Sequence, residues 1–166
     1  MLEFEIDKLT NSIESSISGE TFETVVLPFD VSKTRFLKKK DWIFNWKEEA
    51  ENELRSVYKL VTNQNPKIIH GLVSISINQD HVFLHLVESA KFNKGSEKLY
   101  LGVAGNLIAF ACKIAFENGF NGTVVFDSKT KLITHYQLSI GAKILIGNRM
   151  FIDFKEANSL VKHYFK

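Results

Sequence analysis

The sequence has few of the residues that mark secreted, membrane-bound or disulfide-stabilised proteins. A single cysteine, Cys112, excludes a disulfide within the chain. Because it lies among apolar residues of a predicted helix, we interpret it as a buried apolar side chain and not as a nucleophile. No apolar run approaches the length needed to cross a bilayer, and the first residues show no signal-peptide pattern. We therefore expect a cytoplasmic protein with no membrane contact.

Charge of one sign and metal-ligand clusters are also scarce. The formal net charge is +2 and no arginine-rich stripe is present, so we expect no nucleic-acid partner. The basic run Lys38–Lys40 is followed closely by acidic residues, which favours a solvated face over a contact to phosphates. No histidine has a Cys or Asp partner at metal-ligand spacing, so we expect no metal site.

What is present indicates one globular domain spanning residues 1–166. The chain is 45% hydrophobic and 24% charged, and it is long enough to bury a real core. Periodicity predicts strands near residues 2–6, 22–27, 54–61, 69–77, 82–88, 123–126, 143–146 and 150–153. It predicts helices near residues 32–37, 47–52, 107–118, 129–139 and 155–166. This order predicts an α/β fold, a mixed sheet with helices packed on its faces.

A turn of small residues, Gly102–Asn106, opens the longest predicted helix. It contains two glycines and an alanine, so unpaired N–H groups at the positive end of the helix dipole are free to face a pyrophosphate. The turn lies between the predicted strands 82–88 and 123–126, an order that indicates parallel strands joined by a right-handed crossover. The alternative is that the small residues only allow the helix to pack closely on a sheet.

Two segments resemble motifs of the GNAT superfamily of acyl-CoA-dependent N-acyltransferases. Residues 102–107 are similar to its pyrophosphate loop, and residues 135–142 are similar to its Tyr-x-x-x-Gly-Phe segment. The resemblance covers residues 69–153 and implies a central, mostly antiparallel sheet with one parallel βαβ crossover and helices on both faces. The chain departs from the family at Leu99, where Arg or Gln is usual, and in the longer link between Glu88 and Gly102.

The resemblance implies acetyl-CoA as co-substrate and transfer of its acetyl group to an unidentified primary amine by direct attack. The backbone around Leu86 and Val87 would contact the pantetheine. The pyrophosphate would be bound by backbone amides in the turn, namely those of Gly102, Val103, Ala104, Gly105 and Asn106.

Glu88 and Tyr136 are the candidate catalytic residues. Glu88 ends the strand beside the expected thioester, where partial burial would raise the pKa of its carboxyl toward that of a useful general base. A solvated acid at the end of the strand is the other interpretation. His85 is the alternative base, and we expect it on the opposite face of the strand from Glu88. Tyr136 matches the family's proton donor to the thiolate, and a core aromatic residue is the other interpretation.

Two functional hypotheses follow from these residues. The first is an active N-acetyltransferase with a small-molecule or peptide amine as substrate. The second is a catalytically inactive GNAT-fold module that binds CoA or another protein. The closing hairpin, residues 143–153, is a plausible edge for a homodimer.

Overall fold

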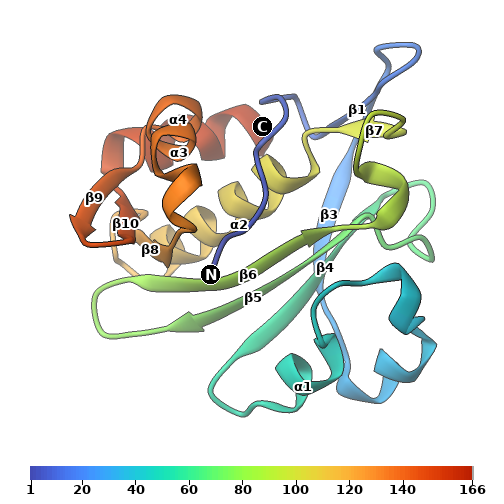
Figure 1. Ribbon diagram of the computed structural model, residues 1–166, viewed down its shortest axis with the longest axis horizontal. Coiled ribbons are helices and arrows are strands. Elements are labelled where there is room, and N and C mark those ends of the chain that lie inside the picture. The colour runs from blue at the N-terminus through green and yellow to red at the C-terminus, as the bar shows by residue number, and fades with distance from the viewer. Residues whose placement is uncertain (166) are drawn as a thin grey trace.

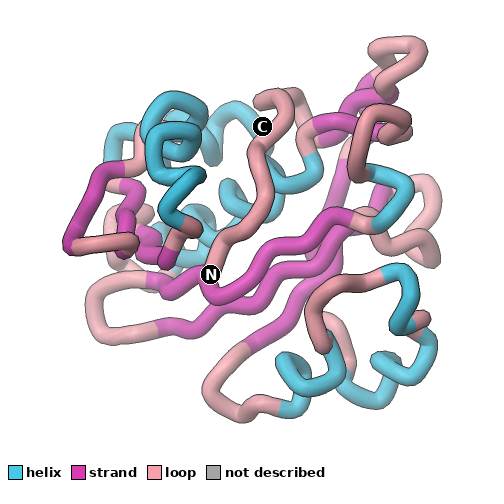
Figure 2. The backbone as a smooth tube through the Cα atoms, viewed as in Figure 1, coloured by secondary structure: helices cyan, strands magenta, loops and turns pink. Residues whose placement is uncertain are grey.

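The computed structural model describes residues 1–165 and contains a seven-stranded sheet in the order β3-β4-β5-β6-β8-β10-β9 (Figure 1, Figure 2). Its strands are β3 (Thr24–Pro28), β4 (Ser56–Thr62), β5 (Gly71–Ile77), β6 (Val82–Ser89), β8 (Val124–Asp127), β9 (Lys143–Ile146) and β10 (Arg149–Ile152). The β6–β8 pair is parallel, and the other neighbours in this sheet are antiparallel.

Helices cover both faces of this sheet (Figure 1). On one face lie α2 (Val103–Glu117), α3 (Ile133–Ile140) and α4 (Phe154–Tyr164), which share the larger core cluster. On the other lies α1 (Trp46–Glu51), with the 3-10 turns η1 (Val31–Phe36) and η2 (Lys39–Asp41) beside it. Since α2 connects β6 to the parallel strand β8, the predicted crossover and the predicted fold class are both confirmed.

A β-bulge in β6 opens the sheet. In the pairing of β5 with β6, Ile75 faces Leu84 whereas Ser74 faces Leu86, so His85 is an extra residue on β6. A bulge bends its strand and interrupts the alternation of side chains. The parallel pairing of β6 with β8 also ends at Leu84 and Phe126, although β6 continues to Ser89. The two strands therefore separate beyond the bulge.

The long link between Glu88 and Gly102 forms structure of its own. It contains the 3-10 turn η3 (Lys91–Asn93) and the short strand β7 (Tyr100–Leu101). With β1 (Ile13–Ser15) and β2 (Thr21–Phe22), β7 makes a three-stranded sheet in the order β2-β1-β7. This insertion anchors the chain just before the turn that begins α2.

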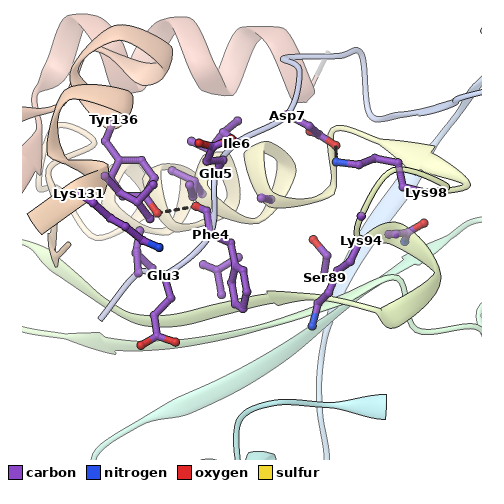
Figure 3. Close-up of a pocket in the computed structure, with 17 residues that line it drawn as sticks. Glu3, Phe4, Glu5, Ile6, Asp7, Ser89, Lys94, Lys98, Lys131 and Tyr136 are labelled. Carbon is purple, nitrogen blue, oxygen red and sulfur yellow. Dashed lines mark hydrogen bonds and ion pairs between the residues drawn. The ribbon is translucent and has the colours of Figure 1, made fainter. Parts of the chain in front are cut away.

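The strand predicted over residues 2–6 is wrong. The segment bends at Phe4 and makes one isolated parallel bridge, Leu2 to Ser128, and no ladder. Its alternation of apolar and acidic residues has another origin, because Leu2 and Ile6 are buried while the acidic residues between them lie toward solvent. The segment runs from the end of β8 toward the N-terminus of α2 (Figure 3).

Candidate functional site

A cleft lies where β6 and β8 separate. It encloses a cavity of about 540 Å³, lined by β6 at Val87 and Ser89, by α2 at Ala104 and by α3 at Tyr136. Residues 2–7 line the cavity as well, and they run through the cleft between α3 and the loop that follows β6 (Figure 3). The cleft thus joins the start of α2 to the predicted acid Tyr136, but part of it is occupied by the chain itself.

The N-terminus of α2 has free backbone donors, as the glycine turn predicts. Gly102 is the N-cap residue, with φ of 89°, a left-handed conformation that favours glycine. Within residues 1–165, the N–H groups of Val103, Ala104 and Gly105 have no acceptor. The prediction fails at Asn106, because its N–H donates to the carbonyl of Gly102 at 2.9 Å as the first intrahelical bond.

The two glycines of the turn also serve close packing. A Cβ at Gly102 would overlap the hydroxyl of Thr10, and a Cβ at Gly105 would overlap the hydroxyl of Tyr164. Thr10 and Tyr164 are themselves connected, since the N–H of Thr10 donates to the Tyr164 hydroxyl at 3.2 Å. The small residues of the turn therefore serve both purposes: they allow close packing, and they leave backbone donors free at the start of α2.

Glu88 is an anchor point rather than an exposed carboxylate. Its side chain is completely buried and accepts hydrogen bonds from Ile43 N at 2.8 Å, Phe44 N at 3.1 Å and Trp46 Nε1 at 2.9 Å. Lys94 Nζ lies 2.6 Å from its second oxygen. A carboxylate that already accepts four donors has little capacity left to take a proton from an amine, so this geometry argues against a general base at Glu88.

The bulge also changes the positions of Leu86 and His85. His85 hydrogen-bonds Ser76 at 2.8 Å, on the same sheet face from which Glu88 contacts α1, so the expectation that these residues face opposite sides is wrong. Leu86 packs with the smaller core cluster beside α1, while Val87 lines the cleft. Burial, followed by the nearby Arg55 guanidinium, lowers the pKa of His85 to about 4, so the ring is neutral at pH 7.

Tyr136 lies in the cleft with its hydroxyl already engaged. The phenol is buried, and its O–H donates to the carbonyl of Phe4 at 2.6 Å (Figure 3). Burial raises the pKa of Tyr136 well above its ordinary value of 10, so the phenol keeps its proton at physiological pH. The residue can donate a proton or a hydrogen bond to a group that takes the place of the Phe4 carbonyl.

Sequence reasoning missed the basic side chains of the cleft. Lys94, Lys98 and Lys131 line it, and the first two lie in the long link between Glu88 and Gly102, for which the sequence predicted no function. Lys98 Nζ lies 3.2 Å from the carboxylate of Asp7 in the N-terminal segment, whereas Lys94 pairs with Glu88. The acidic residues at alternate positions of residues 2–7 were the available signal that basic partners exist. Lys98, the partner of Asp7, lies about ninety residues further along the chain, so a local pattern could not identify it.

A second cavity, of about 600 Å³, lies on the α1 face of the sheet. Its lining combines aromatic residues, Trp42, Phe44 and Trp46, with basic ones, Arg35, Lys38, Lys39 and Lys47. The lining contains no acidic side chain within the described residues. The lysine run therefore helps to form a concave basic surface, which the interpretation as a simple solvated face did not anticipate.

Other site classes receive no support from the part of the chain that the structure describes. Residues 1–165 contain no group of three or more His, Cys, Asp or Glu side chains placed to hold a metal ion. None of the helices in the same range has the length and apolar character of a membrane span. Burial raises the pKa of the Cys112 thiol far above its ordinary value, so this cysteine is protonated and enclosed.

Several solved structures share this fold, which is the fold that the resemblance to the GNAT superfamily implies. Solved structures with this fold include "AtaTR bound with AcCoA", at 14% identity and a TM-score of 0.54, with 83% of this chain and 98% of that chain covered. They also include AtaT complexed with acetyl-methionyl-tRNAfMet, at 14% identity and a TM-score of 0.56, with 83% and 99% covered. A third is a chimera of spermidine N-acetyltransferase SpeG from Vibrio cholerae and hSSAT, at 15% identity and a TM-score of 0.53, with 82% and 98% covered. No protein-family model and no curated protein sequence matches the chain.

The expectation about partners has to be corrected. The small net charge led us to exclude nucleic acid, and the family resemblance led us to expect a small-molecule or peptide amine as substrate. Structures with this fold include a KacTA–DNA complex and the AtaT–tRNA complex, so that exclusion is wrong. Net charge averages over the whole surface, whereas binding depends on local concentrations of charge such as the basic cavity beside α1.

Proposed function

We propose that this protein is an N-acetyltransferase that transfers the acetyl group of acetyl-CoA to an amine. The observation that carries the proposal is the cleft itself. Beyond Leu84 and Phe126 the parallel strands separate, and the gap leads to the free amides of α2 and passes the Tyr136 hydroxyl. Neighbours in fold whose structures contain acetyl-CoA, or which are spermidine acetyltransferases, support the same chemistry.

In this proposal the start of α2 binds the pyrophosphate. The N–H groups of Val103, Ala104 and Gly105 carry the positive end of a 15-residue helix. The N–H of Gly102 donates to the Asp7 carboxylate at 3.1 Å and would join this donor set only after that contact breaks. The unpaired backbone of β6 near Leu86 and Val87 would bind the pantetheine amides. Asn106 is left out of this donor set for the reason given above.

The transfer step needs a neutral amine, a polarised thioester carbonyl and a proton for the leaving thiolate. The amine nitrogen attacks the carbonyl carbon, the carbon–sulfur bond breaks, and the sulfur takes the phenolic proton of Tyr136, which regains a proton from solvent before the next turnover. The amine loses its proton to solvent or buffer, because His85 is a weak base and Glu88 is fully hydrogen-bonded. We therefore assign Glu88 a positioning role, in which it holds the segment Ile43–Trp46 against β6.

The acceptor would approach from the basic cavity beside α1. Phe44 and Trp46 line that cavity, and both are held by Glu88 at the end of β6, next to the expected position of the thioester. The basic lining favours an acceptor that carries negative charge near its amine, such as a phosphate-bearing molecule. The AtaT complex with an acetylated aminoacyl-tRNA is one example of such chemistry in this fold.

A catalytically inactive CoA-binding or protein-interaction module is the second candidate. Occupation of the cleft by residues 2–7 favours it, as does Leu99, whose side chain is exposed where the family usually has Arg or Gln.

The deciding experiment is a calorimetric titration with acetyl-CoA, followed by a thiol-release assay over a panel of amines that includes aminoacyl-tRNA. Because Cys112 is buried, the protein itself adds little background to the thiol signal. Binding together with amine-dependent release supports the enzyme. Binding without release supports the inactive module, and no binding at millimolar acetyl-CoA refutes both in their CoA-dependent form.

A further inference from the structure

Residues 2–7, which we name the N-terminal strap, follow the path that the proposed function gives to the cofactor. The strap begins beside β8, where the N–H of Leu2 donates to the Asp127 carbonyl at 2.7 Å. It ends at α2, where the carboxylate of Asp7 accepts the N–H of Gly102 at 3.1 Å. Between these points it passes Tyr136 (Figure 3), which lines the cleft together with Val87.

The contacts of the strap reproduce the chemistry expected of a bound CoA. Its backbone supplies amide groups, and the carbonyl of Phe4 accepts the Tyr136 hydroxyl. The N–H of Ile6 donates to His135 Nε2 at 2.7 Å. At the pyrophosphate end the Asp7 carboxylate places a negative charge on the α2 N-terminus, a position that stabilises anions.

Charge complementarity points the same way. The strap carries three acidic residues, Glu3, Glu5 and Asp7, in six positions. Two lysines form ion pairs with these residues. Lys98, in the lining of the cleft, lies 3.2 Å from Asp7, and Lys129, just after β8 and outside the lining, lies 3.6 Å from Glu3. A chain of amides with negative charge toward α2 is therefore what this cleft binds, whether it comes from the protein or from a ligand.

We propose that the N-terminal strap is an autoinhibitory segment that competes with acetyl-CoA for the β6–β8 cleft. This inference rests on the proposed function, because it needs that cleft to be the cofactor site. Acetyl-CoA then binds only the fraction of molecules in which the strap has left, so the apparent dissociation constant is the intrinsic one divided by that fraction. Whatever displaces or holds the strap thereby regulates acetyl transfer.

A reversible disulfide tests the proposal most directly. Leu2 and Ser128 are partners in the one bridge of the strap, and bridged neighbours lie about 4.8 Å apart, within the Cα separation that a disulfide spans. The native Cys112 is buried and does not interfere. The double variant Leu2→Cys/Ser128→Cys is titrated with acetyl-CoA after oxidation and again after reduction, with each single variant as control.

A loosened strap supplies the opposite arm. Asp7→Asn removes the charge from the α2 N-terminus and weakens the ion pair with Lys98. Glu53→Gln makes the same change of charge at an exposed position that has no hydrogen bond or ion pair within the described residues, and serves as its control. The oxygen-to-nitrogen replacement keeps the size of each side chain, so folding is retained in both variants.

We expect oxidation of the double cysteine variant to weaken acetyl-CoA binding at least a hundredfold, and reduction to restore it. We expect Asp7→Asn to bind acetyl-CoA about tenfold more tightly than the unmodified protein, and Glu53→Gln to leave binding unchanged. Equal affinity of the oxidised and reduced forms would overturn the strap inference while leaving the proposed function intact. Absence of binding in every form, including the reduced protein and Asp7→Asn, would instead overturn the proposed function.

Discussion

Replacing Glu88 with alanine is the perturbation for which the structure gives the clearest magnitude. The carboxylate accepts hydrogen bonds from four donors, and the alanine variant leaves these donors without this acceptor. Hydrogen bonds to a charged group contribute about 1.5–3 kcal/mol each. Their sum overestimates the loss, because the Lys94 side chain is 24% exposed and turns to water, while the Trp46 indole is buried and cannot. We therefore expect Glu88→Ala to lower the free energy of unfolding by about 3–5 kcal/mol, the range for a buried pair that loses one partner.

Urea denaturation followed by tryptophan fluorescence measures this loss. The chain has two tryptophans, Trp42 and Trp46, and the indole of Trp46 donates to Glu88 itself, so emission also reports on the local change. For a domain of this size the expected loss corresponds to a fall in Tm of roughly 6–20 °C. Glu53→Ala, in an exposed turn, is the control and should change stability by less than about 0.5 kcal/mol.

A loss below about 1 kcal/mol for Glu88→Ala would refute the reasoning, because it would mean that the Ile43–Trp46 segment does not depend on the carboxylate. Glu88→Gln separates anchoring from base catalysis. It keeps one acceptor oxygen, so we expect a smaller loss of stability. If it also retained most of the acetyl transfer, the positioning role would be supported over the role of general base.

The remaining predictions concern titration, reactivity and proton donation. Tyr136→Phe should slow thiol release about a hundredfold, the lower end of the effect of general acid catalysis, and should not reduce the affinity for acetyl-CoA. Tyr58→Phe is the control. Unchanged turnover in Tyr136→Phe would refute the role of Tyr136 as the acid. Burial lowers the pKa of His70 and of His85 to about 4, so in unfolded chains both rings gain protons near pH 6.5 that the native rings do not. Stability should therefore fall as the pH drops from about 6.5 to 4, and thermal melts of His85→Gln should show a shallower fall. Cys112 should react with a thiol reagent only after unfolding, and rapid labelling of the native protein would contradict its burial.

The strap gives a physical reason why an intact site need not be an active one. A cleft that binds its own chain through Asp7, Phe4 and Leu2 is preorganised for an anionic ligand, yet the path that the strap occupies is open to that ligand only when those contacts break. Competition of this kind makes activity depend on the stability of a short segment. A partner that captures the acidic strap would then activate the protein without touching the catalytic residues.

The sequence by itself determined the order along the chain of the seven strands of the main sheet and of the helices between them, together with the character of α2. Local rules suffice for this: the apolar period fixes the buried face of α2, Gly102 adopts the positive φ at which the helix begins, and Gly119 allows its end. The bulge at His85 leaves no comparable signal, because the extra residue is defined only against the partner strand. It is the bulge that places His85 and Glu88 on one face and so reverses the expectation for a regular strand.

The tertiary structure alone decided what the site residues contact. Glu88 accepts donors from residues more than forty positions earlier, and the Tyr136 hydroxyl meets the carbonyl of Phe4 from 132 positions away. An alternation of apolar and acidic residues, such as that over residues 2–6, indicates which side chains are buried but not which surface buries them. Hydrophobic burial is non-directional, so periodicity can identify an element, while the partner is chosen by packing and charge complementarity across the whole fold.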